Sequence, residues 1–130
     1  MIINRTKWQL PQYIQDEFAY LCNQAHIEQN EITCIIKPHK KYKSDCWIKK
    51  GNPNVPSGLM DFANKTIIIR IGRKTHEDDF KFVLAHEIGH FKQYKEAGKL
   101  ETAGDYQTKI IKPEKYATQF AITCNCYPHS

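Results

Sequence analysis

The order of helix-like and strand-like segments predicts an α+β fold, with a small and mainly antiparallel sheet packed against helices. Three observations lead to this prediction. A helical pattern comes first, short apolar runs typical of strands follow, and two further helical patterns complete the chain. The chain has 130 residues, which is the size of one domain. We therefore expect a single domain over residues 1–130, with a tail over about 123–130.

The first half of the chain is expected to hold a helix, two strands and a loop. Residues 11–25 place apolar side chains at helical spacing, and Pro11 suits a first helical turn. Residues 32–36 are apolar and β-branched and predict a strand. Residues 42–49 predict a second, more polar strand. Residues 51–58 are rich in glycine, proline and asparagine, which predicts a loop.

The second half is expected to hold a hairpin and two helices. Residues 58–63 and 65–71 predict the hairpin, and the second segment contains an isoleucine-rich run. A long helix is predicted over about 75–95, because acidic residues in its first turn suit the helix dipole. The last helix is predicted over about 113–122, after a proline that suits its first turn.

Composition excludes several classes of protein. Lysine and arginine number 19 against 14 acidic residues, a net charge of +5, and only 3 of the 19 are arginine, so direct nucleic-acid binding is not expected. No apolar run approaches the roughly 18 residues of a membrane span, and the N-terminal residues do not resemble a secretory signal. Because no secretory signal is expected, we expect a cytoplasmic protein with free thiols, and its five cysteines are odd in number. They are Cys22, Cys34, Cys46, Cys124 and Cys126.

A metal-binding pattern lies in the long predicted helix. His86, Glu87 and His90 form the pattern H-E-x-x-H. Residues four apart share one helix face, so both imidazoles can bind one ion, and zinc lowers the pKa of a bound water to about 7. Glu87 can then remove a proton from that water. A histidine pair at this spacing also occurs as ordinary surface or packed side chains, and that interpretation remains open from the motif alone.

The same helix has a separate apolar face, which supports the helical assignment. That face is formed by Phe80, Leu84, Ile88 and Phe91, well away from the two histidines. Gly89 carries no side chain between the histidines, so we expect another element to pack closely there.

A catalytic zinc site needs a third protein ligand. The extended pattern H-E-x-x-H-x-x-G-x-x-H fails, because Gln93 and Glu96 occupy its last two fixed positions. The downstream candidates are Glu101, Asp105, Glu114 and His129. Glu114 is the best placed of these, since it begins a predicted helix. Ala117, one turn later, would let that helix pack tightly against the histidine helix.

Two motifs together resemble the ImmA/IrrE family of gluzincin-type metallopeptidases. They are the H-E-x-x-H motif and the sequence Glu-Lys-Tyr-Ala-Thr-Gln-Phe-Ala at residues 114–121, which is similar to the family's E-x-x-A-N-x-F-A. The resemblance covers roughly residues 10–122. The chain departs from the family at Thr118, where an asparagine is usual. It departs again at residues 123–126, where Thr-Cys-Asn-Cys replaces the family's apolar continuation.

The resemblance implies a zincin-like fold with one zinc ion per chain, bound by His86, His90 and Glu114, and with Glu87 as general base. Family members are typically encoded by phages and mobile elements, and they cleave a helix-turn-helix repressor. The resemblance therefore implies a zinc-dependent metallopeptidase that hydrolyses a peptide bond in such a repressor. The alternative is a zinc-containing regulatory module that binds its partner without cleaving it, as an anti-repressor or a toxin–antitoxin component.

Other features admit a functional and a structural interpretation, and the structural one is favoured. The two cysteines of the tail and His129 resemble part of a soft-metal site. Because only three ligands are present and the segment is terminal, an ordinary tail that binds no metal is favoured. The lysine-rich run over residues 37–43 is expected to be a solvated loop. Cys22, Cys34 and Cys46 are expected in the core. Candidates to stabilise a transition-state oxyanion are His76, Tyr94, Tyr106 and Tyr116.

Overall fold

The computed structural model describes residues 1–39, 54–96 and 113–128. Several sequence-based expectations fall on the remaining residues and lie outside this description. They are the strand predicted at 42–49 and the residues Cys46, Glu101, Asp105, Tyr106 and His129.

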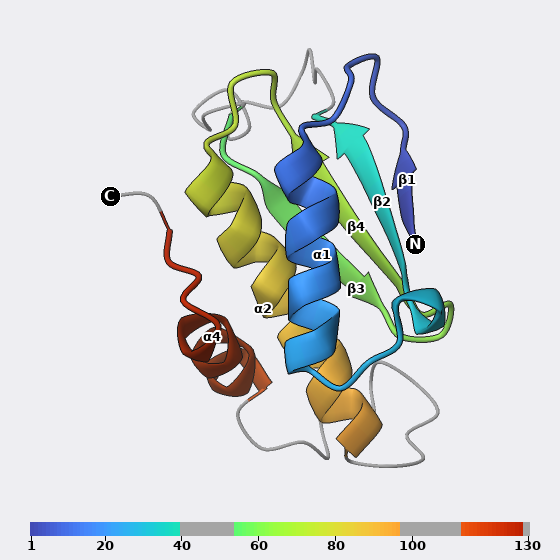
Figure 1. The fold of residues 1–130 in the computed structure, drawn as a ribbon, viewed down its shortest axis with the longest axis vertical. Helices are drawn as coiled ribbons and strands as arrows, with labels where there is room; N and C mark the ends of the chain where they lie inside the picture. The colour runs from blue at the N-terminus through green and yellow to red at the C-terminus, as the bar shows by residue number, and fades with distance from the viewer. Residues whose placement is uncertain (40–53, 97–112, 129–130) are drawn as a thin grey trace, which may run out of the picture.

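The described residues form an α+β fold, as predicted (Figure 1). In chain order the elements are β1 (Ile2–Asn4), α1 (Gln12–Gln24), a short 3-10 helix (Gln29–Glu31), β2 (Thr33–Pro38), β3 (Ser57–Asp61), β4 (Thr66–Ile71), α2 (Glu77–Glu96) and α4 (Pro113–Thr123). The three predicted helices and the hairpin of β3 and β4 are confirmed. Strand β1 and the 3-10 helix were not predicted.

The prediction of a mainly antiparallel sheet was wrong. Four strands of the described chain form one mixed sheet in the order β1-β2-β4-β3. Strand β2 runs parallel to both β1 and β4, and only β3 and β4 are antiparallel. The reason is connectivity: α1 carries the chain back between β1 and β2, so these two strands point the same way. Strand β4 then pairs with β2 on one side and with β3 on the other.

The core lies between the sheet and the helices α1 and α2. Buried isoleucines alternate along β4, with Ile67 and Ile69 fully covered. The apolar face predicted for α2 supplies Phe80, Leu84 and Ile88, which are at most 1% exposed. Both helices lie on the same side of the sheet (Figure 1). Within the described residues, no helix has the length and apolar character needed to cross a membrane.

Helix α4 packs closely against α2 at Gly89. A Cβ atom at this glycine would lie 3.0 Å from Cα of Ala117 and 3.2 Å from its carbonyl oxygen. The close approach expected at Gly89 is therefore confirmed, and Ala117 is fully buried. This contact sets the start of α4 beside the middle of α2.

Candidate metal centre

Three side chains from two helices converge at the junction of α2 and α4. Nε2 of His86 lies 2.8 Å from Oε2 of Glu114, and Nε2 of His90 lies 3.2 Å from Oε1 of the same carboxylate. The two Nε2 atoms are 3.1 Å apart. The histidines project from one face of α2, four residues apart, and Glu114 comes from the first turn of α4. The structure thus brings together residues that are separated by 28 positions in the sequence.

The separations of these donor atoms suit a divalent metal ion. In a tetrahedral zinc site with bonds of about 2.0–2.1 Å, neighbouring donors lie about 3.3 Å apart. The three separations here are 2.8, 3.1 and 3.2 Å, so a small outward shift would accommodate an ion. Two imidazole nitrogens and one carboxylate are also a donor set that zinc accepts. His86, Glu87 and His90 offer ligand atoms within 4.8 Å of one another and can hold a metal.

Burial gives His90 and Glu87 distinct electrostatic environments. Burial, followed by the neighbouring His86, lowers the pKa of His90, which favours the neutral imidazole that binds metals. Glu87 is 7% exposed, and burial, with a smaller effect of Glu114, raises the pKa of its carboxyl group to about 7.

A cavity of about 200 Å³ opens beside these groups. Its lining consists of Gly58, Leu59, Met60, Phe62, Glu87, His90, Pro113 and Glu114. Strand β3 therefore forms one wall, and α2 and the start of α4 form the others. One side of the cavity is therefore apolar, and the other side carries the polar groups Glu87, His90 and Glu114.

Gly58 lets β3 approach α2 at this cavity. A Cβ atom there would lie 2.8 Å from Cγ1 of Val83 and 2.9 Å from Cγ of Glu87. Gly58 was not predicted as part of the site. The sequence feature that could have identified it is a glycine within a strand, which often marks the close approach of another element.

Thr118 contacts the second nitrogen of His86. Its Oγ1 atom lies 3.4 Å from Nδ1 of that imidazole. This is the residue that replaces the family's usual asparagine. The hydroxyl therefore lies where a group that orients the histidine ring would be expected.

The described candidates for oxyanion stabilisation do not line the cavity. The hydroxyl of Tyr116 donates to Glu96 at 2.7 Å and accepts from Lys92 at 2.9 Å, which links α4 to α2. The ring of Tyr94 packs 4.8 Å from that of Phe62. His76 lies just before α2 and is exposed.

The tail beyond α4 packs against α1. The thiol of Cys126 donates to Oε1 of Glu17 at 3.3 Å, and the hydroxyl of Tyr20 donates to the carbonyl of Cys124 at 3.3 Å. Both cysteines are 3% exposed. Among the described residues, neither belongs to a group with metal-ligand geometry, and His129 lies outside those residues.

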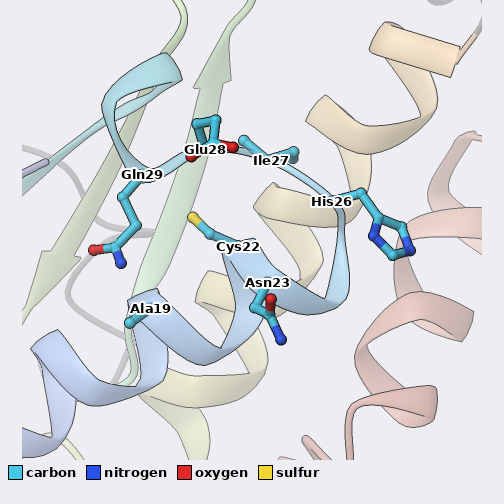
Figure 2. A pocket seen from close by; sticks show the side chains of 7 residues that line it. All are labelled: Ala19, Cys22, Asn23, His26, Ile27, Glu28 and Gln29. Carbon is cyan, nitrogen blue, oxygen red and sulfur yellow. The ribbon is translucent and has the colours of Figure 1, made fainter.

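A larger hollow, of about 370 Å³, lies at the end of α1 (Figure 2). It is lined by Ala19, Cys22, Asn23, His26, Ile27, Glu28 and Gln29. His26 points away from the other labelled side chains (Figure 2). Burial raises the pKa of the Cys22 thiol to about 11, so this group is a poor nucleophile. The histidine cluster between α2 and α4 is therefore the better candidate site.

The comparison with protein families agrees with this site. The family model of the IrrE N-terminal-like domain, Peptidase M78, matches residues 49–125, more than half of the chain. The chain belongs to this family. The resemblance to the ImmA/IrrE family is thus confirmed, and membership supports a metal-dependent peptidase that acts on protein. A comparison with curated proteins found no match.

Proposed function

We propose that this protein is a zinc-dependent metallopeptidase with a zincin-like fold, formed by a single domain over residues 1–130. His86, His90 and Glu114 would hold one zinc ion, and Glu87 would act as general base. The observation that carries this proposal is the meeting of two Nε2 atoms and one carboxylate beside buried Glu87. Membership in a peptidase family supports the same assignment.

Each residue has a distinct task in peptide hydrolysis. Bound zinc would supply a Lewis acid for the scissile carbonyl and lower the pKa of a water molecule. Glu87 would accept a proton from the attacking water at its carboxylate and then pass it to the nitrogen of the leaving amine. Its position in the cavity wall, next to His90, supports this role. Thr118 would hold the ring of His86 in its binding orientation.

Strand β3 suggests how a protein substrate would bind. It is an edge strand of the described sheet and forms a wall of the cavity. An extended peptide can pair with the free backbone groups of an edge strand, which would place its peptide bonds beside Glu87. Met60 and Phe62 would then contact an apolar substrate side chain.

We further propose that the substrate is a helix-turn-helix repressor of a phage or mobile element, cleaved at a specific site in the cytoplasm. This proposal follows from the resemblance to the ImmA/IrrE family. The alternative is a zinc-containing module that binds the repressor and leaves it intact, as an anti-repressor or a toxin–antitoxin component would. Thr118, in place of asparagine, is compatible with that alternative.

The decisive experiment compares the wild-type protein with Glu87→Gln. The helix-turn-helix repressor proposed as substrate is co-expressed with each, and its size and repression are followed. Glutamine is close in shape but cannot accept the proton, so cleavage should fall by about 10²- to 10⁴-fold. Zinc content should stay level. Glu77→Gln, at the exposed start of the same helix, is the matched control and should cleave normally.

Cleavage by wild type and Glu77→Gln, but not by Glu87→Gln, supports the peptidase. Equal relief of repression by wild type and Glu87→Gln, with an intact repressor, contradicts it and favours the binding module. Wild-type protein that binds no zinc contradicts both interpretations.

A further inference from the structure

The face of the sheet that points away from α1 and α2 carries a continuous apolar row. Register places Ile3 beside Ile35, Ile35 beside Ile68, and Ile68 beside Leu59. The row therefore crosses all four described strands. Leu59 is 61% exposed, and the three isoleucines are partly exposed. Buried residues alternate with these along the strands and face the helices.

A row of cations borders this apolar row. Lys37 pairs with Arg70 in the register, two residues along the strands from Ile35 and Ile68. Arg5 follows β1 beside Lys37, since its N–H donates to the carbonyl of Ile36. The Arg70 guanidinium donates to the carbonyl oxygen of Pro38 at 3.3 Å. Among the described residues, no carboxylate forms an ion pair with these three cations.

This arrangement is unusual for parallel strands. Sheets with parallel pairing are normally covered on both faces, and contiguous exposed apolar groups mark interaction sites. The described helices cover one face only (Figure 1). A covering element is therefore expected on the outer sheet surface, defined here as the apolar row and the cation row together.

We propose that the outer sheet surface binds an amphipathic helix of a partner protein, with acidic residues along one flank of that helix. Neighbouring strands lie about 4.8 Å apart, and successive turns of a helix lie about 5.4 Å apart. A helix lying across the strands would thus place one apolar side chain near each member of the row. Acidic residues beside them would meet Arg5, Lys37 and Arg70.

The charges of the outer sheet surface favour an acidic partner helix over two other occupants, which are a second copy of the chain and nucleic acid. A second copy of the chain would bring another three cations and, on the opposite border of the row, the carboxylate of Asp61. Nucleic acid would pair with the cations but would leave the adjacent apolar row uncovered. An acidic amphipathic helix would cover the apolar row and also pair with the cation row.

The test uses two fluorescently labelled synthetic helical peptides and the full chain. Both peptides carry leucines on one face, with glutamates along one flank of the first peptide and lysines in the same places on the second. Fluorescence anisotropy measures the binding of each. The wild-type chain should prefer the glutamate peptide by at least about tenfold, which corresponds to roughly 1.4 kcal/mol. Leu59→Glu should remove that binding.

A charge reversal tests whether lost peptide binding is caused by a loss of folding. The double variant Lys37→Glu with Arg70→Glu should lose the glutamate peptide and gain the lysine peptide, which an unfolded chain would not do. Ile122→Glu on α4, where the isoleucine is 37% exposed, is the matched control and should bind like wild type. These measurements need neither zinc nor Glu87, so their failure would leave the proposed peptidase untouched.

Several outcomes would overturn the proposal. One is equal binding of both peptides, or no binding of either. Another is binding of the glutamate peptide that Leu59→Glu and the double variant leave unchanged. Sedimentation that shows a wild-type dimer, dissociated by Leu59→Glu, would assign the surface to a second copy. Binding to duplex DNA, lost in the double variant and without peptide binding, would assign it to nucleic acid.

Discussion

The hydroxyl oxygen of Thr118 lies 3.4 Å from Nδ1 of His86, whose other ring nitrogen faces Glu114. One imidazole is thus contacted on both sides by residues of α4. Groups that orient a metal-binding histidine typically contribute 10- to 100-fold to metal affinity. Because the contact is long, we expect Thr118→Val to weaken zinc binding by about tenfold, near the lower limit of that range. Thr118→Asn should retain affinity.

Competition with a fluorescent chelator would measure these affinities. Thr123→Val is the control, because its hydroxyl donates to the carbonyl of Gln119 on the same helix and does not contact a histidine. Zinc affinity that is equal in Thr118→Val and wild type would show that the hydroxyl does not orient His86.

Removal of Glu114 should have a larger effect on zinc than any change at Thr118. Its carboxylate is the acidic group that contacts both Nε2 atoms. We expect Glu114→Ala to lose stoichiometric zinc in native mass spectrometry. Glu101→Ala and Asp105→Ala should keep one ion per chain. Full affinity in Glu114→Ala, with loss in either of the other two, would assign the third ligand elsewhere.

Gly58→Ala should impair cleavage while zinc stays bound. The added Cβ would meet Val83 and Glu87 at less than 3.0 Å, so β3 or the glutamate must move. Overpacking of this kind costs about 1–3 kcal/mol of stability. Peptidase assays, zinc content and urea unfolding would be compared with Ser57→Ala, the exposed neighbour in the same strand. Unchanged cleavage and stability in Gly58→Ala would contradict the close approach of β3 to α2.

Tyr116→Phe should loosen α4. The hydroxyl joins Lys92 and Glu96 of α2 through two hydrogen bonds, and a single such bond typically contributes about 1 kcal/mol. We expect the free energy of unfolding in urea to fall by about 1 kcal/mol or slightly more. Tyr127→Phe, where the ring is 53% exposed, should have no measurable effect. Equal stability of the two variants would show that the link contributes nothing.

The buried thiols should resist alkylation in the native protein. Burial raises the pKa of Cys34 and that of Cys126 to about 12. At pH 8, the thiolate fraction is then on the order of 10⁻⁴, against about a quarter for an ordinary thiol of pKa about 8.5. In a Cys46→Ser background, iodoacetamide should label these thiols slowly, and the rate should rise as pH increases. Mass spectrometry would measure labelling, and denatured protein, which should react rapidly, is the control.

The helices could be predicted because their signals are local. The apolar face of α2 repeats at helical spacing, and His86 and His90 are adjacent on a helix whatever the tertiary fold. Strand direction has no such local signal. Strand β2 pairs with β4 although β3 lies between them in the sequence, and the three-residue β1 is too short to show alternation.

The clustering of the candidate site residues could be predicted where its signals were also local. The motif identified Glu87 and its two histidines, and the small residue Ala117 pointed to close packing that brings Glu114 to them. Gly58 and the link from Tyr116 to Lys92 were not identified. Both depend on which strand and which helix face meet α2, and this is decided by the assembled fold.

Along β3, successive side chains belong to different surfaces. Gly58 and Met60 lie on the side of α2, whereas Leu59 between them is 61% exposed on the opposite face. Because side chains alternate with a period of two, inserting or deleting one residue within this strand would exchange the two sets. Bulk would then enter the space beside Glu87, and the outer row would lose its last member. The strand can vary in composition, but its length is constrained from both sides of the sheet.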